Sequence, residues 1–454
     1  MDSSAAERVR IDVMVRGLIG CLTTTDALAA LFSDDSVLQA MLDFEAALAR
    51  AESRCGLISA EAAEAIAGAC ESPRYDPKAL AVEIRRQAAM AIPVVKALTE
   101  NVRQVSPLAA RFVHWGATTQ DVTETALVIL LGRARAVLAA DHERALKTLR
   151  RVSDEHAKTV MLGRTILQAA PPVTFGLKAA GWYAALRRDW IRLDAAFEEA
   201  LVLEFGGASG TLAALAEKGG EVARLLGEEL GLAVPAAPWH THRDRLAAVV
   251  ADCGIYTATL GKIARDATLL MQQEVAEAEE AGGGGSSAMP HKRNPSSFTI
   301  VLACANRTPG LVADFLAGMV QEHERGIGGL HAEWMTISNV VEATGSALSA
   351  MAHGMDHLVV HPERMAANIR ATRGLVFSER VMMQIAAATG RDAAHALLSE
   401  ASRMAVERDI SLAVAISLMP DIAELLTPEQ IATLDRPEEY LGSAEEFRRA
   451  LLED

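Results

Sequence analysis

The residues best suited to chemistry lie in one glycine-rich stretch, residues 282–295, which reads GGGGSSAMPHKRNP. The glycines precede Ser286 and Ser287, and Lys292 and Asn294 follow them. Glycine reaches backbone angles that other residues avoid, so this segment can change shape and bring main-chain N–H groups close to a ligand. Hydroxyls, cations and an amide on one loop suit a multiply charged anion whose chemistry requires a proton transfer. By composition alone, the stretch is also typical of a flexible linker.

A polar turn at residues 114–121, which reads HWGATTQD, is suited to bind the same kind of anion. It stands where a long helix should begin, so the hydroxyls of Thr118 and Thr119 would lie beside free N–H groups of the helix start. The same residues also fit an ordinary helix cap. His114 could carry a proton, contact a charge, or serve only the structure.

Two further segments add polar candidates. The stretch GRTILQ at residues 163–168 contains an arginine, a threonine and a glutamine, and it also fits a capped turn between two helices. The stretch WHTHRDR at residues 239–245 places His240 and His242 on one face of an extended chain. A metal site needs further ligands, and none is spaced obviously nearby, so we do not expect a metal here.

Charged residues are dense from 321 to 334, where the sequence reads QEHERGIGGLHAEW. This density fits either an active-site wall or a solvated helix end. His353, His357 and His361 are spaced four apart, but no carboxylate stands at a matching position and Pro362 follows. We therefore interpret these histidines as a partly exposed helix face.

Composition limits the class of protein. The chain has 454 residues and a formal charge of 44 minus 59, or −15, which disfavours binding to nucleic acids or anionic membranes. Its 5 cysteines form no CxxC pair, which indicates reduced thiols. Residues 1–16 are charged and have no apolar core of signal-peptide length, and the chain has no continuous apolar run long enough for a membrane span. We expect a soluble, cytoplasmic protein.

The chain should fold almost entirely as helices, because alanine, leucine, glutamate and arginine dominate and valine-isoleucine runs are short. Short helices are expected at 27–32, 36–55 and 59–70 and again beyond residue 361. Long helices are expected at 122–162, from Pro171-Pro172 to about 203, at 245–281, at 296–320 with a kink at Pro309, and at 335–358. The expected domains are 1–112, 113–360 and 361–454. Long helices with broad apolar surfaces need partners on several sides, so we expect a bundle shared between subunits.

Taken together, these stretches resemble the fumarase/aspartase superfamily. The sequence GSSAMPHKRNP at 285–295 resembles its signature loop, HWGATTQD its first shared region, and GRTILQAAPPVTFG at 163–176 its second. The resemblance implies an all-α fold whose long central bundle pools into a homotetramer, flanked by two smaller helical domains. It also implies active sites built from three subunits. Members catalyse β-elimination, or its reverse, on carboxylate substrates without metal or organic cofactor.

The resemblance also implies roles for individual residues. Ser286 or Ser287 transfers the proton, and His114 is a further catalytic residue. The following residues are expected to bind a small polycarboxylate: Thr118, Thr119, Gln120, Arg164, Thr165, Gln168, His242, Arg243, Met289, Lys292, Asn294 and Arg325.

Two branches of the superfamily share HKRNP and RGLVFSERVMM with this chain: adenylosuccinate lyases and bacterial 3-carboxy-cis,cis-muconate cycloisomerases. The segments VHWGATTQD, PWHTHRDR and EHERGIGGLHAEW resemble the second branch. The lyases generally carry a histidine where this chain has Ile166, and isoleucine cannot transfer protons. An amine leaving group needs a proton, whereas a carboxylate with a pKa of about 4 departs without one. His114 or His242 could replace the missing histidine.

Three hypotheses follow. The main one is intramolecular addition of a carboxylate of 3-carboxy-cis,cis-muconate to a double bond, giving 4-carboxymuconolactone in aromatic catabolism. The second is an adenylosuccinate lyase or another C–N lyase. The third is a catalytically silent structural protein, because the superfamily includes lens crystallins. The intact SSAMPHKRN sequence argues against this last reading.

Overall fold

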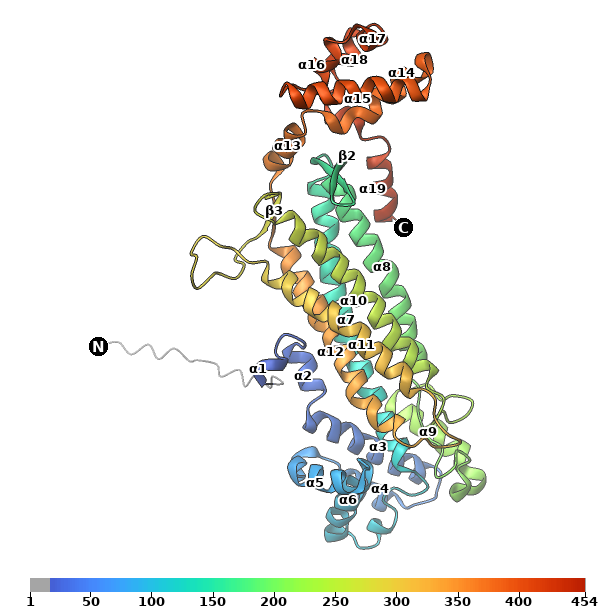
Figure 1. The fold of residues 1–454 in the computed structure, drawn as a ribbon. Coiled ribbons are helices and arrows are strands. Elements are labelled where there is room, and N and C mark those ends of the chain that lie inside the picture. Colours follow the sequence, from blue (N-terminus) through green and yellow to red (C-terminus); the bar gives the residue numbers. More distant parts are fainter. Residues whose placement is uncertain (1–16, 454) are drawn as a thin grey trace, which may run out of the picture. The chain divides into compact units, whose positions relative to one another are not determined.

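The computed structural model describes residues 17–453. Residues 1–16, for which the sequence predicts no signal peptide, and residue 454 lie outside the described part. Helices dominate the described chain, which confirms the all-α expectation, and two small two-stranded sheets accompany them. Figure 1 shows the elements in chain order.

The N-terminal elements are short helices, as the sequence predicts. They are α1 (Gly17–Gly20), α2 (Asp26–Leu31), α3 (Asp34–Arg54), α4 (Ala60–Ala67), α5 (Pro77–Gln87) and α6 (Ala91–Val105). Thr25, Ser33 and Ser59 cap α2, α3 and α4, because each side chain accepts a hydrogen bond from a backbone N–H of the first helical turn. The apolar face of α3 is buried, which fixes how the first domain packs.

The long helices also form, with shifted ends. They are α7 (Thr119–Glu155), α8 (Phe175–Ala200), α10 (Asp244–Leu270), α11 (Ser296–Gly318) and α12 (Gly329–Asp356). Pro309 lies inside α11, as expected. Between α8 and α10 the chain forms α9 (Gly219–Leu230).

At two places where the sequence predicts helix, the structure forms a strand instead. The helix expected to reach residue 162 ends at Glu155, and β1 (Val160–Thr165) pairs antiparallel with β2 (Gln168–Thr174). Pro171 and Pro172 therefore belong to β2 and not to the first turn of α8, and the ladder changes register at this point. Proline is tolerated beside such an irregularity because it has no N–H to pair.

The predicted end of the helix at 245–281 is also wrong. It stops at Leu270, and β3 (Ala278–Glu280) precedes the glycine-rich loop. β3 pairs antiparallel with β4 (Leu358–Val360), which follows α12. The glycine-rich loop therefore connects β3 to α11. Because β3 pairs with β4, the start of the loop is held by the segment that follows α12.

The remaining C-terminal helices are short, as predicted. They are α13 (Pro362–Ala371), α14 (Ser378–Thr389), α15 (Arg391–Glu407), α16 (Leu412–Ser417), α17 (Pro420–Ala423), α18 (Pro428–Ala432) and α19 (Ala444–Glu453).

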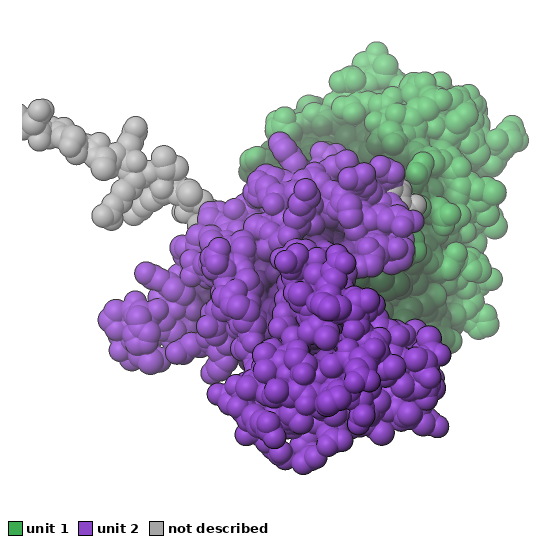
Figure 2. All heavy atoms as spheres, turned by 90° about the horizontal axis from the view of Figure 1, so that it is seen from above, with its two compact units in different colours: residues 1–142, 189–261, 300–350 green, residues 143–188, 262–299, 351–454 purple. Residues whose placement is uncertain are grey.

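Two compact units make up the chain (Figure 2). Unit 1 comprises residues 1–142, 189–261 and 300–350, and unit 2 comprises 143–188, 262–299 and 351–454. A hydrophobic core in unit 1 joins α3, α4, α6 and α9, and one in unit 2 joins α13 to α16. The domain boundaries at 112 and 360 remain a prediction.

Small residues let α10 and α11 approach closely inside unit 1. A Cβ on Gly254 would lie 2.8 Å from Val312, and one on Gly261 would lie 2.6 Å from Ala305. By length and composition alone, both helices could cross a membrane, but buried core helices pass the same test. In its most apolar window α10 is 56% buried, whereas α11 is only 22% buried. An apolar face of α11 is therefore left without cover in this chain.

Candidate active site

Asp121 organises the turn that opens α7 in unit 1. Its buried carboxylate accepts hydrogen bonds from the backbone N–H groups of Thr118, Gly206 and Gly207, at 2.9, 3.0 and 2.9 Å. Gly116 has a φ of +75°, and a Cβ there would lie 2.6 Å from the side chain of Leu215. This turn therefore needs glycine, and Asp121 holds it against the loop after α8.

Gln120 and Arg325 form a second set of contacts at the same helix start. The buried Gln120 amide donates to the His240 carbonyl at 2.7 Å and accepts from Arg325 Nη1 at 3.3 Å. Arg325 also donates to the carbonyls of Gly207 and Ala208. These partners are all neutral, so within the described chain the positive charge of Arg325 is not cancelled by a carboxylate, which suits it to an anionic ligand.

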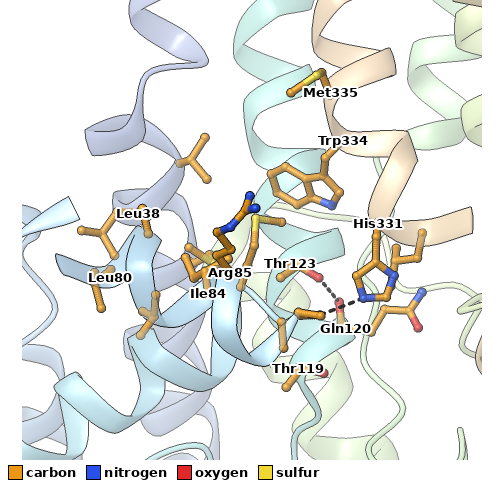
Figure 3. A pocket seen from close by; sticks show the side chains of 18 of the residues that line it. Leu38, Leu80, Ile84, Arg85, Thr119, Gln120, Thr123, His331, Trp334 and Met335 are labelled. Atoms are coloured by element: carbon orange, nitrogen blue, oxygen red, sulfur yellow. Dashed lines mark hydrogen bonds between the residues drawn. The ribbon is translucent and has the colours of Figure 1, made fainter. Parts of the chain in front are cut away.

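A cavity of about 980 Å³ opens beside these residues (Figure 3). Thr119, Gln120 and Thr123 of α7 lie at its polar end, near His331 of α12. On the other side, Figure 3 shows Leu38 of α3 and Leu80 and Ile84 of α5, together with the charged Arg85 of α5. The His331 ring contacts the Ala88 carbonyl at 2.9 Å, so α12 is anchored to the end of α5. Unit 1 thus brings hydroxyls, an amide and a cation to one edge of a cavity.

His114 lies just before this turn and is held by a buried acid. Its Nδ1 is 2.6 Å from Glu45 Oε1, and the side chains of His114 and Glu45 are 17% and 0% exposed. Burial would lower the pKa of His114, but the charge of Glu45, the hydrogen bond to it and the charge of Asp121 outweigh burial and raise that pKa. Glu45 is not among the residues predicted from the sequence, although a charged residue on the apolar face of α3 is a signal that the sequence contains.

Asp121, Glu204 and His240 form a buried cluster whose potential ligand atoms lie within 4.8 Å of one another. His240 Nε2 is 2.7 Å from Asp121 Oδ1 and 3.2 Å from Glu204 Oε1. Burial is the main reason that the pKa of Glu204 rises to about 8. The 2.7 Å separation is that of a hydrogen bond, so the cluster fixes the loop that carries His240 to the start of α7.

Arg243 and His242 have opposite environments. The guanidinium of Arg243 is fully buried, bonds Glu124 at 2.7 Å and Glu333 at 2.6 Å, and stacks over Trp239. It therefore has no surface from which to contact a ligand, and the expectation that it binds substrate directly is not favoured by this geometry. His242 is exposed and remains accessible.

Unit 2 holds the glycine-rich loop. An antiparallel bridge between Gly284 and Asn294 closes its neck, and the Gly284 N–H donates to Ser296 Oγ at 2.9 Å. At its base the buried Glu280 accepts hydrogen bonds from the N–H and hydroxyl of Ser297. The residues between Gly284 and Asn294 therefore project from a fixed neck.

The two loop serines differ in their contacts. Ser286 Oγ accepts hydrogen bonds from the backbone N–H groups of Ala288 at 3.3 Å and Met289 at 3.1 Å. Ser287 is exposed, as are Met289 and Lys292, and Lys292 forms no ion pair within the described residues. The Asn294 amide donates to the Gly285 carbonyl at 3.4 Å. The loop thus presents one serine with oxyanion-type donors, and its Lys292 is a cation without an ion pair among the described residues.

The β1–β2 hairpin carries the third predicted region. Arg164 makes a bidentate ion pair with the buried Glu277, at 2.8 and 2.9 Å, so most of its donor capacity is already used. Thr165 and Gln168 are exposed beside the two-residue turn. In that turn Ile166 has a φ of +49° and is 96% exposed. A β-branched residue in the left-handed region at an exposed tip is strained, and such strain often marks function.

The described chain thus assembles Thr118, Thr119, Gln120 and Arg325 in unit 1, whereas the loop and the hairpin belong to unit 2. A family model described as "Lyase" matches residues 21–310, and one described as "Adenylosuccinate lyase C-terminus" matches residues 374–450. This chain belongs to the lyase family.

Several known proteins are similar to this chain over nearly its whole length. A 3-carboxy-cis,cis-muconate cycloisomerase of Bradyrhizobium diazoefficiens is 44% identical, over 96% of this chain and 97% of its own length. One from Pseudomonas aeruginosa is also 44% identical, over 97% of both chains. The crystal structure of 3-carboxy-cis,cis-muconate lactonizing enzyme from Pseudomonas putida matches with a TM-score of 0.91 at 42% identity, covering 96% of this chain and 98% of that one. The fold therefore is the fumarase/aspartase-type fold that the motifs predicted.

Proposed function

We propose that this chain converts 3-carboxy-cis,cis-muconate to 4-carboxymuconolactone. The observation that carries the proposal is the 44% identity, over almost the full length, to relatives with that activity in their names. Ile166 agrees with it, because carboxylate addition to a double bond needs no proton donor at that position, whereas release of an amine does.

In the proposed reaction, a carboxylate oxygen of the substrate forms a C–O bond to the β carbon of a neighbouring double bond. The π electrons move onto the adjoining carboxylate, which becomes an aci-carboxylate. The α carbon then takes a proton from the enzyme, so the trianion becomes a lactone dianion. The enzyme regains the proton from water, and no other atom is gained or lost.

Ser286 is our candidate for the proton transfer. When its hydroxyl gives up the proton, the negative oxygen is stabilised by the N–H groups of Ala288 and Met289, which already donate to it. Ser287 has no such donors among the described residues. The structure thus favours the first serine, a choice that the sequence leaves open.

The substrate carboxylates would be held by residues that different subunits contribute to one site. Thr118, Thr119 and Arg325 supply hydroxyls and an uncompensated cation in unit 1. Lys292 and Asn294 supply a cation and an amide from the loop. Thr165, Gln168 and His242 are exposed polar groups that can complete the site, and His114 can contribute a charge.

The assembly that we propose is a cytoplasmic homotetramer whose active sites each combine regions from three subunits. The exposed apolar face of α11 and the exposed tip of the β1–β2 hairpin both support such an assembly, because apolar surface of this kind is normally covered. All 5 cysteines are free thiols, in keeping with a reducing compartment.

Purified protein tests the activity directly. Loss of the ultraviolet absorbance of 3-carboxy-cis,cis-muconate should accompany formation of 4-carboxymuconolactone, identified by NMR. The Ser286→Ala, Ser287→Ala double variant, assayed at the same concentration, controls for uncatalysed cyclisation. A folded tetramer that does not exceed the double variant would refute the proposal.

A further inference from the structure

His114 is held in a conformation that its own sequence does not favour. Its φ of +60° lies in the left-handed region, which non-glycine residues seldom occupy, and Gly116 follows with a φ of +75°. The ring is fixed at the same time by the 2.6 Å contact between Nδ1 and Glu45 Oε1. A strained backbone and a clamped ring together indicate that the orientation of this imidazole matters.

Glu45 lies in an unusual place for a charge. It is on α3, within the hydrophobic core of unit 1, and its side chain is 0% exposed. Its second oxygen, Oε2, has no hydrogen-bond partner among the described residues. A buried, ionised carboxylate is very costly without a partner, so the contact with His114 is the interaction that makes its charge tolerable.

A second buried acid on α3, Glu52, affects the electrostatics around Glu45. Glu52 is fully buried, and neither of its oxygens has a hydrogen-bond partner. Burial first, and the charge of Glu45 second, raise the pKa of Glu52 to about 9. Two buried carboxyls on one helix do not both ionise easily, so a neutral Glu52 removes a competing negative charge from the surroundings of Glu45 and His114.

The charged groups that act on His114 are therefore Glu45 from α3 and Asp121 from the start of α7. Both are acidic, and both favour the imidazolium form. In that form Nδ1–H donates to Glu45, and Nε2–H is left as a second donor. A histidine that already carries both protons cannot accept one, but it can bind a carboxylate.

We propose that Glu45 is a positioning residue that keeps His114 protonated, so that His114 binds a substrate carboxylate as a cationic donor and does not act as the base. This inference rests on the proposed function for the identity of the anion. It also divides the catalytic work: the loop serine transfers the proton, and His114 supplies charge.

The direct test is Glu45→Gln, which keeps the size of the side chain and removes its charge. Glu52→Gln is the matched control, because it lies on the same helix and exchanges one neutral buried side chain for another. Labelling with [13Cε1]histidine lets the titration of His114 be followed by NMR without substrate, with His114→Asn to assign its signal. We expect the titration midpoint to fall by at least about one pH unit in Glu45→Gln and to stay in place in Glu52→Gln.

The second readout is the pH dependence of ligand binding and turnover. His114 must be protonated to bind, so affinity for tricarballylate, a stable tricarboxylate, and kcat/KM should both fall as the pH rises through the pKa of His114. In Glu45→Gln this loss should occur at lower pH, with KM affected more than kcat. Glu45→Asp, which keeps the charge, should restore part of the shift.

Each outcome decides the inference. A His114 titration that does not move in a folded Glu45→Gln protein overturns it, and so does a shifted titration with an unshifted pH profile of tricarballylate binding. A reduced thermal stability with neither shift would show that Glu45 is only structural. If both shifts occur but the protein does not turn over the muconate, the proposed function fails and the Glu45–His114 coupling stands.

Discussion

Replacing Ser286 by alanine tests the loop chemistry, and the structure gives the size of the effect. The substitution removes one hydroxyl, which accepts hydrogen bonds from two backbone N–H groups in an exposed turn. Water can replace it as their acceptor, so the free energy of unfolding should change by less than about 0.5 kcal/mol. Turnover should respond much more strongly, because a positioned proton-transfer group contributes about 10²–10⁴-fold to a rate.

The expected loss in kcat is thus about 3–5 kcal/mol of transition-state stabilisation. Ser287→Ala is the matched comparison, since its hydroxyl lies one residue away, is exposed and receives no such donors. We expect less than about a tenfold loss in this second variant, because it keeps the acid. Initial rates from ultraviolet absorbance, with circular dichroism to confirm folding, measure both. Equal losses in the two variants, or a larger loss in Ser287→Ala, would refute our assignment of the proton transfer.

Three other substitutions test separate parts of the account. Arg243→Ala should cost about 3–5 kcal/mol in chemical denaturation, because it leaves the carboxylates of Glu124 and Glu333 buried without their cation; a cost below about 1 kcal/mol would contradict the buried network. Ile166→Asn should raise the free energy of unfolding by about 0.5–1 kcal/mol, since asparagine tolerates a φ of +49° better than a β-branched residue; a fall in the unfolding temperature would contradict it. Glu52 has a pKa of about 9 in the folded protein and about 4.3 when unfolded, so its stabilising contribution is complete below about pH 4 and is lost as the pH rises towards 9. The unfolding temperature of Glu52→Gln, relative to the unaltered protein, should therefore rise between pH 5 and pH 8, and a constant difference would show that Glu52 does not titrate in this window.

Helical periodicity predicted most of the fold because long apolar faces repeat without interruption. It failed where no helix breaker marks the change from helix to strand. After Glu155 the chain enters β1 because Val160–Thr165 can pair with Gln168–Thr174, and that pairing joins residues on the two sides of a turn. Hydrophobic periodicity within a short segment carries no information about this strand pairing. Pro171 and Pro172 also resemble the start of a helix.

The site could be predicted only where the motif itself carries the chemistry. The serines, Lys292 and Asn294 stand together in sequence, so their types and spacing alone name them as candidates, and their roles stay a prediction. Glu45 and Glu277 were missed, because each meets its partner far along the chain: the residue numbers in the two pairs differ by 69 for His114 and by 113 for Arg164. For Arg243 the sequence could not show the burial between two acids, Glu124 and Glu333, and its predicted contact with substrate stays a prediction.

The most direct test of the central claim compares two substrates on one purified preparation. We expect kcat/KM for 3-carboxy-cis,cis-muconate to exceed that for adenylosuccinate by at least about 10⁴-fold, since a site without a proton donor at Ile166 should handle a carboxylate and not an amine. Turnover of adenylosuccinate that equals or exceeds turnover of the muconate would contradict this account and assign the chain to C–N cleavage.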